Sequence, residues 1–237
     1  QDLDILSAFR NPIFAHSGAN QTVMWLLASA VGESLLVDAS ATSNGGYWRS
    51  NERFAPHNLY TSASDQMSRH ADSADAVTSS PFVYSDAVSG LDGSRVHFSM
   101  ENVDIDWTFE DGRYVRRQDG ALHQTTEGVM TTDNIVILSV DYGIDPAAPN
   151  ANMVSSGTAV VFRDGTRVHG SWQRSSATSA FTLVSDSGQT IPLTPGRTWV
   201  ELVDRDSAYL QINTPVPPCS LISTIPSATI GNCIADS

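Results

Sequence analysis

The stretch Val103-Asp104-Ile105-Asp106-Trp107-Thr108-Phe109-Glu110-Asp111-Gly112-Arg113-Tyr114-Val115 carries the clearest fold signal in the sequence. Apolar and polar residues alternate along it, which is the period of a β-strand with one buried face. Asp111-Gly112 interrupts the alternation, and this dipeptide is typical of a two-residue hairpin turn. The stretch therefore predicts two antiparallel strands joined by a tight turn.

Similar segments continue on both sides of this stretch. The run Val96–Met100 alternates in the same way before it, and Asp164-Gly165 marks a second hairpin turn after it. Further strands are expected over Ile135–Val140, Thr158–Phe162, Val168–Trp172, Phe181–Val184, Thr190–Leu193 and Trp199–Val203. Residues from about 81 to 212 are therefore predicted to be mostly antiparallel β-structure.

The first 80 residues have a different pattern. Ile13–Ala15 and Leu35–Asp38 are short apolar runs typical of buried strands, and Ala19–Val31 between them has the apolar spacing of a helix. Further helices are expected over Asp2–Arg10 and Ser62–Arg69. The strand–helix–strand order predicts a parallel pair of strands covered on both faces.

Together these patterns predict an α+β fold. A small α/β layer, residues 1–80, is expected to pack on a mainly antiparallel β subdomain, residues 81–214. Residues 215–237 form a Pro/Ser-rich tail that contains Cys219 and Cys233. Their spacing suits a local disulfide, which would stabilise the fold by about 3 kcal/mol and would indicate an oxidising compartment. Two unrelated thiols are the alternative.

The bulk composition excludes several classes of function. The chain has 237 residues, 41% of them apolar, and a net charge of -13. Because phosphate backbones and anionic membrane surfaces attract cations, we expect neither nucleic acid nor such a membrane as a partner. The sequence has no segment long enough for a transmembrane span and no dinucleotide, phosphate-loop or zinc-ligand spacing, so we expect no cofactor and no metal.

The candidate functional residues fall in two short segments. His16, Ser17 and Asn20 lie where a predicted strand passes into a predicted helix, whose first backbone N–H groups can bind an anion. The second segment, Arg53–Ser62, is stiffened by its proline. It contributes Arg53, His57, Asn58 and Tyr60. Where the two segments meet, we expect a site for a small anionic or cell-wall ligand.

Each of these residues also has a structural interpretation. Ser17 and Asn20 can cap the helix. His57 and Asn58 can tie their segment to neighbouring backbone groups. A hydrolase would use Ser17 as nucleophile with His57 and Asp38 as partners, but Ser17 does not lie in a Gly-x-Ser-x-Gly elbow. Tryptophans on an open face would suit stacking on sugar rings, with core packing as the alternative; the candidates are Trp48, Trp107, Trp172 and Trp199.

Two blocks of motifs resemble a known family. The first is Pro12-Ile13-Phe14-Ala15-His16-Ser17-Gly18-Ala19-Asn20, followed by Arg53-Phe54-Ala55-Pro56-His57-Asn58-Leu59-Tyr60-Thr61-Ser62. The second is Gly157-Thr158-Ala159-Val160-Val161-Phe162-Arg163-Asp164-Gly165, then Gly170-Ser171-Trp172, then Pro195-Gly196-Arg197-Thr198-Trp199-Val200. In this order, up to about residue 204, they are similar to the YerB-like lipoprotein family of bacterial cell-envelope proteins of unknown function.

The resemblance implies an exported protein, extracellular or in the cell envelope, with no assigned reaction or catalytic residues. Family members carry a further N-terminal portion with a signal or lipid anchor, so residues 1–80 are expected to be the remainder of a larger domain in a processed or truncated product. We expect a non-enzymatic module that binds a ligand or a protein partner, the cleaved N-terminal portion included. The alternatives are a hydrolase acting on a cell-wall component and a subunit of an extracellular assembly that completes its sheet with another chain.

Overall fold

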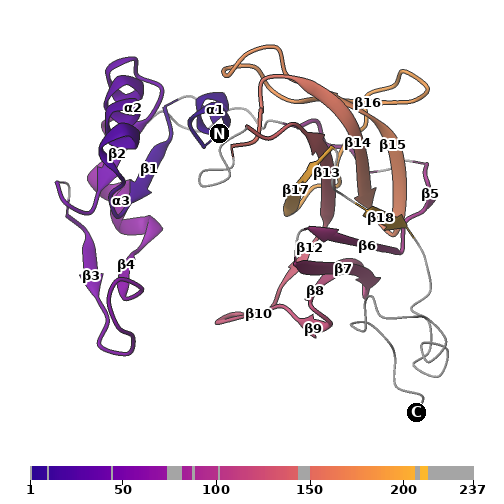
Figure 1. Ribbon diagram of the computed structural model, residues 1–237, viewed down its shortest axis with the longest axis horizontal. Helices are drawn as coiled ribbons and strands as arrows, with labels where there is room; N and C mark the ends of the chain where they lie inside the picture. Colours follow the sequence, from indigo (N-terminus) through magenta and orange to yellow (C-terminus); the bar gives the residue numbers. More distant parts are fainter. Residues whose placement is uncertain are drawn as a thin grey trace. The chain divides into compact units, whose positions relative to one another are not determined.

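The computed structural model describes residues 2–9, 11–43, 45–73, 82–86, 89–100, 102–143, 150–205 and 209–212 (Figure 1). The chain forms two compact units, residues 1–81 with 174–180 and residues 82–173 with those from 181 onward. The predictions for Cys219, Cys233 and the tail fall outside the described residues. None of the helices in the described part has the length and apolar character needed to cross a membrane.

The first unit contains a two-stranded parallel sheet. β1 and β2 pair with Ile13 opposite Val37, and helix α2 connects them, as the sequence predicts. Leu27 and Ala30 of α2 pack with Leu36 in a small core. The elements of this unit are α1 (Asp2–Leu6), η1 (Ser7–Phe9), β1 (Ile13–His16), α2 (Gln21–Gly32), β2 (Val37–Ser40), β3 (Tyr47–Arg49), β4 (Leu59–Thr61) and α3 (Ala63–Arg69).

The proline-containing segment of the first unit belongs to a β-hairpin. β3 and β4 pair antiparallel with Trp48 opposite Tyr60, and residues 50–58 form the loop between them. The sequence does not indicate this hairpin, because strands of three residues carry too little alternation to be recognised. The predicted helix follows the hairpin as α3, and the hydroxyl of Ser62 caps it by accepting a 3.1 Å hydrogen bond from the N–H of Asp65.

The second unit contains two larger sheets, visible in Figure 1. One has the strand order β12-β8-β7-β6-β18, with β9 also paired to β8, and the other has the order β16-β15-β14-β13-β17, with β5 also paired to β15. Their strands are β5 (Leu91–Asp92), β6 (Arg95–Met100), β7 (Val103–Glu110), β8 (Arg113–Gln118), β9 (Ala121–Leu122), β12 (Thr131–Thr132), β13 (Asn134–Val140), β14 (Ser156–Arg163), β15 (Thr166–Gln173), β16 (Thr182–Ser185), β17 (Thr198–Asp204) and β18 (Tyr209–Ile212). Two short strands, β10 (Gln124–Thr125) and β11 (Gly128–Val129), form a separate ribbon.

The core of the second unit lies between these two sheets. Alternate residues of one sheet meet alternate residues of the other, as in a β-sandwich. The buried cluster consists of Val96, Phe98, Ile105, Trp107, Tyr114, Ile135, Ile137, Val160, Phe162 and Val203. The opposite face of β13 is also buried, at Val136 and Leu138, so this strand is covered on both sides. Burial of both faces accounts for the uninterrupted run of apolar residues in the sequence of β13.

The two predicted hairpin turns are confirmed. Asp111-Gly112 joins β7 to β8, and Asp164-Gly165 joins β14 to β15. All four residues have positive φ, between 49° and 84°. This is the conformation that makes Asp-Gly a favoured two-residue hairpin loop.

Two features of the second unit differ from the expectation. β17 pairs with β13 in parallel, Asn134 opposite Thr198, within a region expected to be mostly antiparallel. Side-chain alternation does not depend on strand direction, so the sequence pattern could not reveal this. Residues 190–193 form isolated bridges instead of a strand. Pro192 has no N–H for a ladder, and its carbonyl instead accepts a 3.0 Å hydrogen bond from Arg163.

Strands outweigh helices in the described residues. The helices are α1, α2, α3 and the short η1, all in the first unit, whereas strands continue through both units. The fold is therefore rich in β-structure, and the helical part of the expected α+β fold is confined to the small first unit. The sequence did not indicate the short strands β3, β4 and β9–β12, because strands of two or three residues show no clear alternation.

A close approach of backbones beside Trp172 depends on Gly157. The indole N–H of Trp172 donates a 2.9 Å hydrogen bond to the carbonyl of Ser139, across the position of Gly157. A Cβ atom at residue 157 would lie 2.2 Å from that carbonyl oxygen and 2.7 Å from the indole nitrogen. Only glycine allows this bridge between β13 and β15.

We expect the substitution Gly157→Ala to destabilise the second unit. The added methyl group must displace the Ser139 carbonyl or break its bond to Trp172, at a cost of about 2–4 kcal/mol in the free energy of unfolding. Urea denaturation followed by tryptophan fluorescence would measure the loss. Gly143→Ala is the matched control, since a Cβ atom there would make an ordinary van der Waals contact, 3.6 Å from the carbonyl oxygen of Asn150. Equal stability of the two variants would contradict the role of Gly157.

Candidate functional site

His16 ends β1 and is held on both sides of its ring. Its Nε2 lies 2.7 Å from a carboxylate oxygen of Asp38, and its Nδ1 accepts a 3.2 Å hydrogen bond from the backbone N–H of Gly18. Because Nδ1 accepts, the proton sits on Nε2 and is donated to Asp38. Both ring nitrogens are therefore engaged, and the pair fixes the ends of β1 and β2 beside the start of α2.

Tyr47 of β3 connects the hairpin to this pair of strands. Its hydroxyl donates a 2.6 Å hydrogen bond to the carbonyl of Ala39 on β2. Burial raises the pKa of Tyr47, the backbone N–H of His16 opposes that shift, and the charge of Asp38 adds to it. The phenol therefore stays protonated and acts as a tie between β2 and β3.

Asn20 and Ser17 occupy the turn between His16 and α2. The side chain of Asn20 accepts a 3.0 Å hydrogen bond from the N–H of Val23, which is the geometry of a helix N-cap. Ser17 is exposed, and the structure gives its hydroxyl no hydrogen bond within the described residues. The His16 nitrogens are already engaged, so His16 cannot act as its general base.

Arg53 and His57 lie in the exposed loop of the β3–β4 hairpin. Within the described residues, no hydrogen bond or ion pair joins either side chain to His16, Ser17 or Asn20. Figure 1 shows this loop at the end of the hairpin away from α3. The structure thus brings together His16, Asp38 and Tyr47, and it presents the loop residues as a separate group.

Asn58 closes this loop. Its side-chain amide donates a 3.0 Å hydrogen bond to the carbonyl of Ser50, and its side-chain oxygen accepts a 2.7 Å hydrogen bond from Arg49. The backbone of Ser50 also donates to the carbonyl of Asn58 at 2.8 Å. The loop is therefore held at its base, while Phe54 at its tip is 93% exposed.

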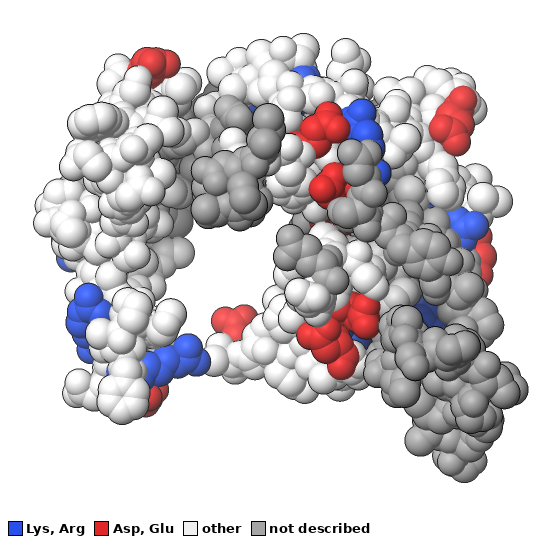
Figure 2. Space-filling view, in the orientation of Figure 1, with Lys and Arg blue, Asp and Glu red and all other residues white. Residues whose placement is uncertain are grey.

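Trp48 and Tyr60 form an aromatic surface on one flank of the hairpin. Their rings stack with centroids 6.3 Å apart and planes inclined by 25°. Trp48 is 52% exposed and Tyr60 37% exposed. Arg53 lies in the exposed loop between these two strands, and Figure 2 shows arginine at the surface of this hairpin. We call Trp48, Arg53, Phe54 and Tyr60 the hairpin surface.

Sequence reasoning found Arg53 and Tyr60 of this surface and missed the pairing of Tyr60 with Trp48. The other tryptophans considered for sugar stacking serve the core: Trp107 and Trp172 are buried, and Trp199 is half-buried against Trp107. Two short runs, Tyr47–Arg49 and Leu59–Thr61, directly border residues 50–58 in the sequence. Recognising these runs as paired strands would have placed Trp48 opposite Tyr60.

A buried amide holds the base of the hairpin. Gln66 of α3 is 3% exposed, and its side-chain N–H groups reach the carbonyl of Gly45 at 3.1 Å and the hydroxyl of Thr61 at 2.8 Å. The hydroxyl of Thr61 in turn donates to the carbonyl of Gly46 at 2.7 Å. These contacts fix both strands of the hairpin to α3.

A cluster of charged groups in the second unit is enclosed in the core. Arg116 and Glu201 are each 5% exposed, and the Arg116 guanidinium carbon lies 5.1 Å from the ring centroid of Trp199. Burial raises the pKa of Glu201 and lowers that of Arg116, and each group's charge opposes the shift of the other. The cluster joins β8 to β17, and we assign it a structural role.

The comparisons with known proteins agree on one family. Residues 1–77 match the N-terminal domain model of a protein family of unknown function (DUF3048), and residues 94–200 match its C-terminal domain model. The crystal structure of the YerB protein from Bacillus subtilis superimposes with a TM-score of 0.68 at 20% sequence identity, covering 88% of this chain and 73% of that chain. At that identity the likeness concerns the fold alone. The curated proteins yielded no match.

We expect Asn58→Ala to loosen the hairpin loop without unfolding the first unit. The substitution removes the bonds to Ser50 and Arg49, worth about 1 kcal/mol locally. The amide of Ser50 should then exchange with solvent several-fold faster in hydrogen-exchange measurements, while amides of α2 remain unchanged. Asn51→Ala is the control, because the structure shows no side-chain bond for the exposed Asn51. Equal exchange in both variants would show that Asn58 does not close the loop.

Proposed function

The chain belongs to the DUF3048 family of proteins of unknown function, and we propose that it is an exported cell-envelope protein that binds an anionic glycan through the hairpin surface. The stacked and exposed pair of Trp48 and Tyr60, on a hairpin whose exposed loop carries Arg53, is the observation that carries this proposal. The C–H face of a sugar ring matches an aromatic plane, so adjacent rings on one flank offer a platform for a saccharide chain.

The charge of the hairpin selects for an anionic ligand. Residues 47–61 contain two arginines and one glutamate, in a chain whose net charge is -13. The structure shows no ion pair for Arg53 within the described residues, and Arg49 is bonded only to the neutral Asn58. The Arg53 guanidinium is therefore available to carboxylates or phosphates of a ligand, whereas Arg49 serves to hold the loop.

Preorganisation of the hairpin supports binding. The contacts of Gln66 and Asn58 hold the base and the loop before any ligand arrives. Less conformational freedom is then lost on binding than a mobile loop would lose. The proposal includes no reaction, because the described residues place no free base beside Ser17.

We expect the protein to co-sediment with bacterial cell-wall sacculi that retain their anionic polymers and to bind weakly to sacculi from which these polymers have been removed. Trp48→Ala should weaken binding about five- to tenfold through loss of stacking. Arg53→Gln should weaken it by a smaller factor and reduce its sensitivity to salt. Trp25→Ala is the matched control, since Trp25 is also exposed, at 68%, but lies on α2. Equal binding to both kinds of sacculi would refute the proposal.

A second candidate function is association with another copy of this chain through the first unit. α2 exposes Val23, Trp25 and Leu26, at 45%, 68% and 55% of their surfaces. In the described residues the sheet of β1 and β2 has only these two strands, although parallel sheets are usually covered and extended. An exposed apolar helix face beside a short sheet is typical of an interaction surface.

The same two tryptophan substitutions distinguish this second candidate from the first. If the outer face of α2 mediates self-association, light scattering should show a concentration-dependent increase in mass that Trp25→Ala reduces and Trp48→Ala leaves unchanged. A monomeric mass at all accessible concentrations would argue against self-association and would leave the glycan proposal intact.

A further inference from the structure

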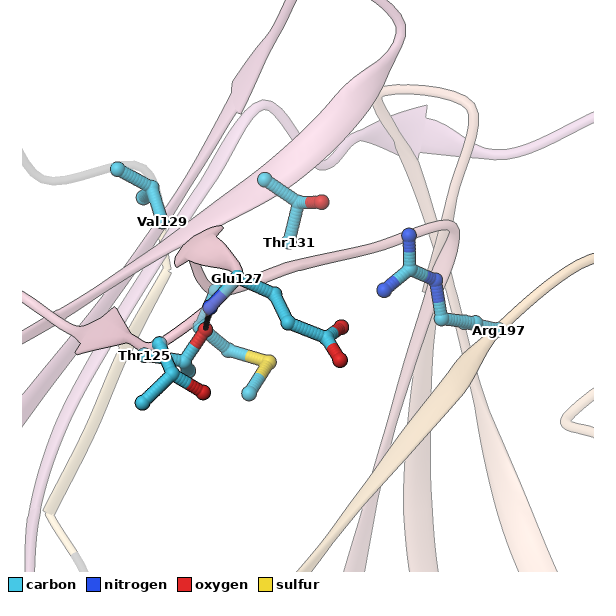
Figure 3. A pocket seen from close by; sticks show the side chains of 7 residues that line it. Thr125, Glu127, Val129, Thr131 and Arg197 are labelled. Carbon is cyan, nitrogen blue, oxygen red and sulfur yellow. Dashed lines mark hydrogen bonds between the residues drawn. The ribbon is translucent and has the colours of Figure 1, made fainter. Parts of the chain in front are cut away.

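A pocket lies between the β10–β11 ribbon and the segment that enters β17. Its volume is about 410 Å³, within the range typical of small-molecule sites. Figure 3 shows the Glu127 carboxylate, the Thr131 hydroxyl and the Arg197 guanidinium pointing into the same space. All of these residues belong to the second unit, so the pocket is distinct from the hairpin surface.

The backbone of Arg197 is fixed to an unusual degree. Its N–H donates a 2.7 Å hydrogen bond to the carboxylate of Asp133. Its carbonyl accepts from the backbone N–H groups of Asp133 and Asn134, at 3.1 and 3.0 Å, and from the hydroxyl of Thr132 at 2.9 Å. The side chain, in contrast, is exposed and has no ion pair among the described residues. The guanidinium group of Arg197 therefore extends from a backbone that is held in place by hydrogen bonds.

Glu127 is presented in a similar way from the opposite wall. It lies in the turn of the ribbon, and its N–H donates a 3.2 Å hydrogen bond to the hydroxyl of Thr125. That hydroxyl donates in turn to the carbonyl of Gly128 at 2.8 Å, which closes the turn. Within the described residues, the Glu127 carboxylate forms no hydrogen bond or ion pair.

The pocket therefore holds one positive and one negative group that do not neutralise each other. A simple anion would be attracted by Arg197 and repelled by Glu127. A simple cation would be attracted by Glu127 and repelled by Arg197. A molecule with both charges satisfies both groups at once. Val129 and Met130 add apolar surface to the lining of the pocket, suited to a small aliphatic side chain.

We propose that this pocket binds a short zwitterionic peptide. Its free α-carboxylate pairs with Arg197, and its free α-ammonium group pairs with Glu127. The hydroxyl of Thr131 supplies a further hydrogen-bonding group to the peptide backbone. This site goes beyond the glycan binding proposed for the hairpin, and neither depends on the other.

Isothermal titration calorimetry with alanyl-alanine and trialanine tests the proposal on the whole chain. We expect millimolar or tighter binding of at least one peptide. N-acetylation should weaken binding to the wild type about tenfold or more, and so should C-terminal amidation. Glu127→Gln should bind the free and the N-acetylated peptide with equal affinity. Arg197→Gln should bind the free and the C-terminally amidated peptide with equal affinity.

Arg205→Gln is the matched control, since Arg205 is an exposed arginine that follows the opposite end of β17. It should leave peptide binding unchanged. Glu127→Gln and Arg197→Gln should keep the thermal stability of the wild type, because both side chains are exposed and form no ion pair within the described residues. Absence of binding by both peptides, or equal binding of the free, acetylated and amidated forms, would overturn the proposal. Loss of stability in both Glu127→Gln and Arg197→Gln would also overturn it, since it would show that the two residues pair with each other.

Discussion

Buried side-chain amides hold two loop regions of this protein in place. Gln66 bonds to Gly45 and Thr61 at the base of the hairpin. Asn134 is fully buried, donates to the carbonyl of Thr194 at 2.8 Å and accepts from its N–H at 2.8 Å. Asn134 satisfies a backbone donor and a backbone acceptor at once and so replaces ladder bonds that its loop lacks, whereas Gln66 contributes through its N–H groups.

This constraint explains why charged side chains remain unpaired at the surface. The backbone around Arg197 and the loop around Arg53 are fixed by bonds that do not involve either guanidinium group. A ligand that orders an exposed arginine side chain reduces its conformational entropy, and ordering a mobile loop at the same time would add a backbone cost. Here the loops are already ordered, and the charge is available to a ligand.

The two units differ in how they bury their apolar residues. The second unit encloses a sandwich core and also buries the Arg116–Glu201 pair, and the pocket proposed for a peptide lies beside the turn of the β10–β11 ribbon, outside this core. The first unit has a small core around Leu27 and leaves Trp25 and Trp48 exposed. These exposed side chains are the basis of the two proposals for the first unit, glycan binding by the hairpin and self-association through α2.

The sequence by itself determined the local elements. Period-two alternation and Asp-Gly turns identified β6–β8 and the β14–β15 hairpin, because those signals depend only on neighbours in the chain. The motif blocks identified the family, as the matches to both domain models confirm. His16, Asn20 and Asn58 were selected as notable residues, but their partners were not: Asp38 binds His16 and not His57.

Only the tertiary structure decided the pairings that cross long stretches of sequence. The parallel contact of β13 with β17, the stacking of Trp48 on Tyr60 and the placement of Glu127 opposite Arg197 join residues that no local period relates. Side-chain alternation records which face of a strand is buried. It does not record which strand lies beside it or in what direction, because those are set by the packing of the whole chain.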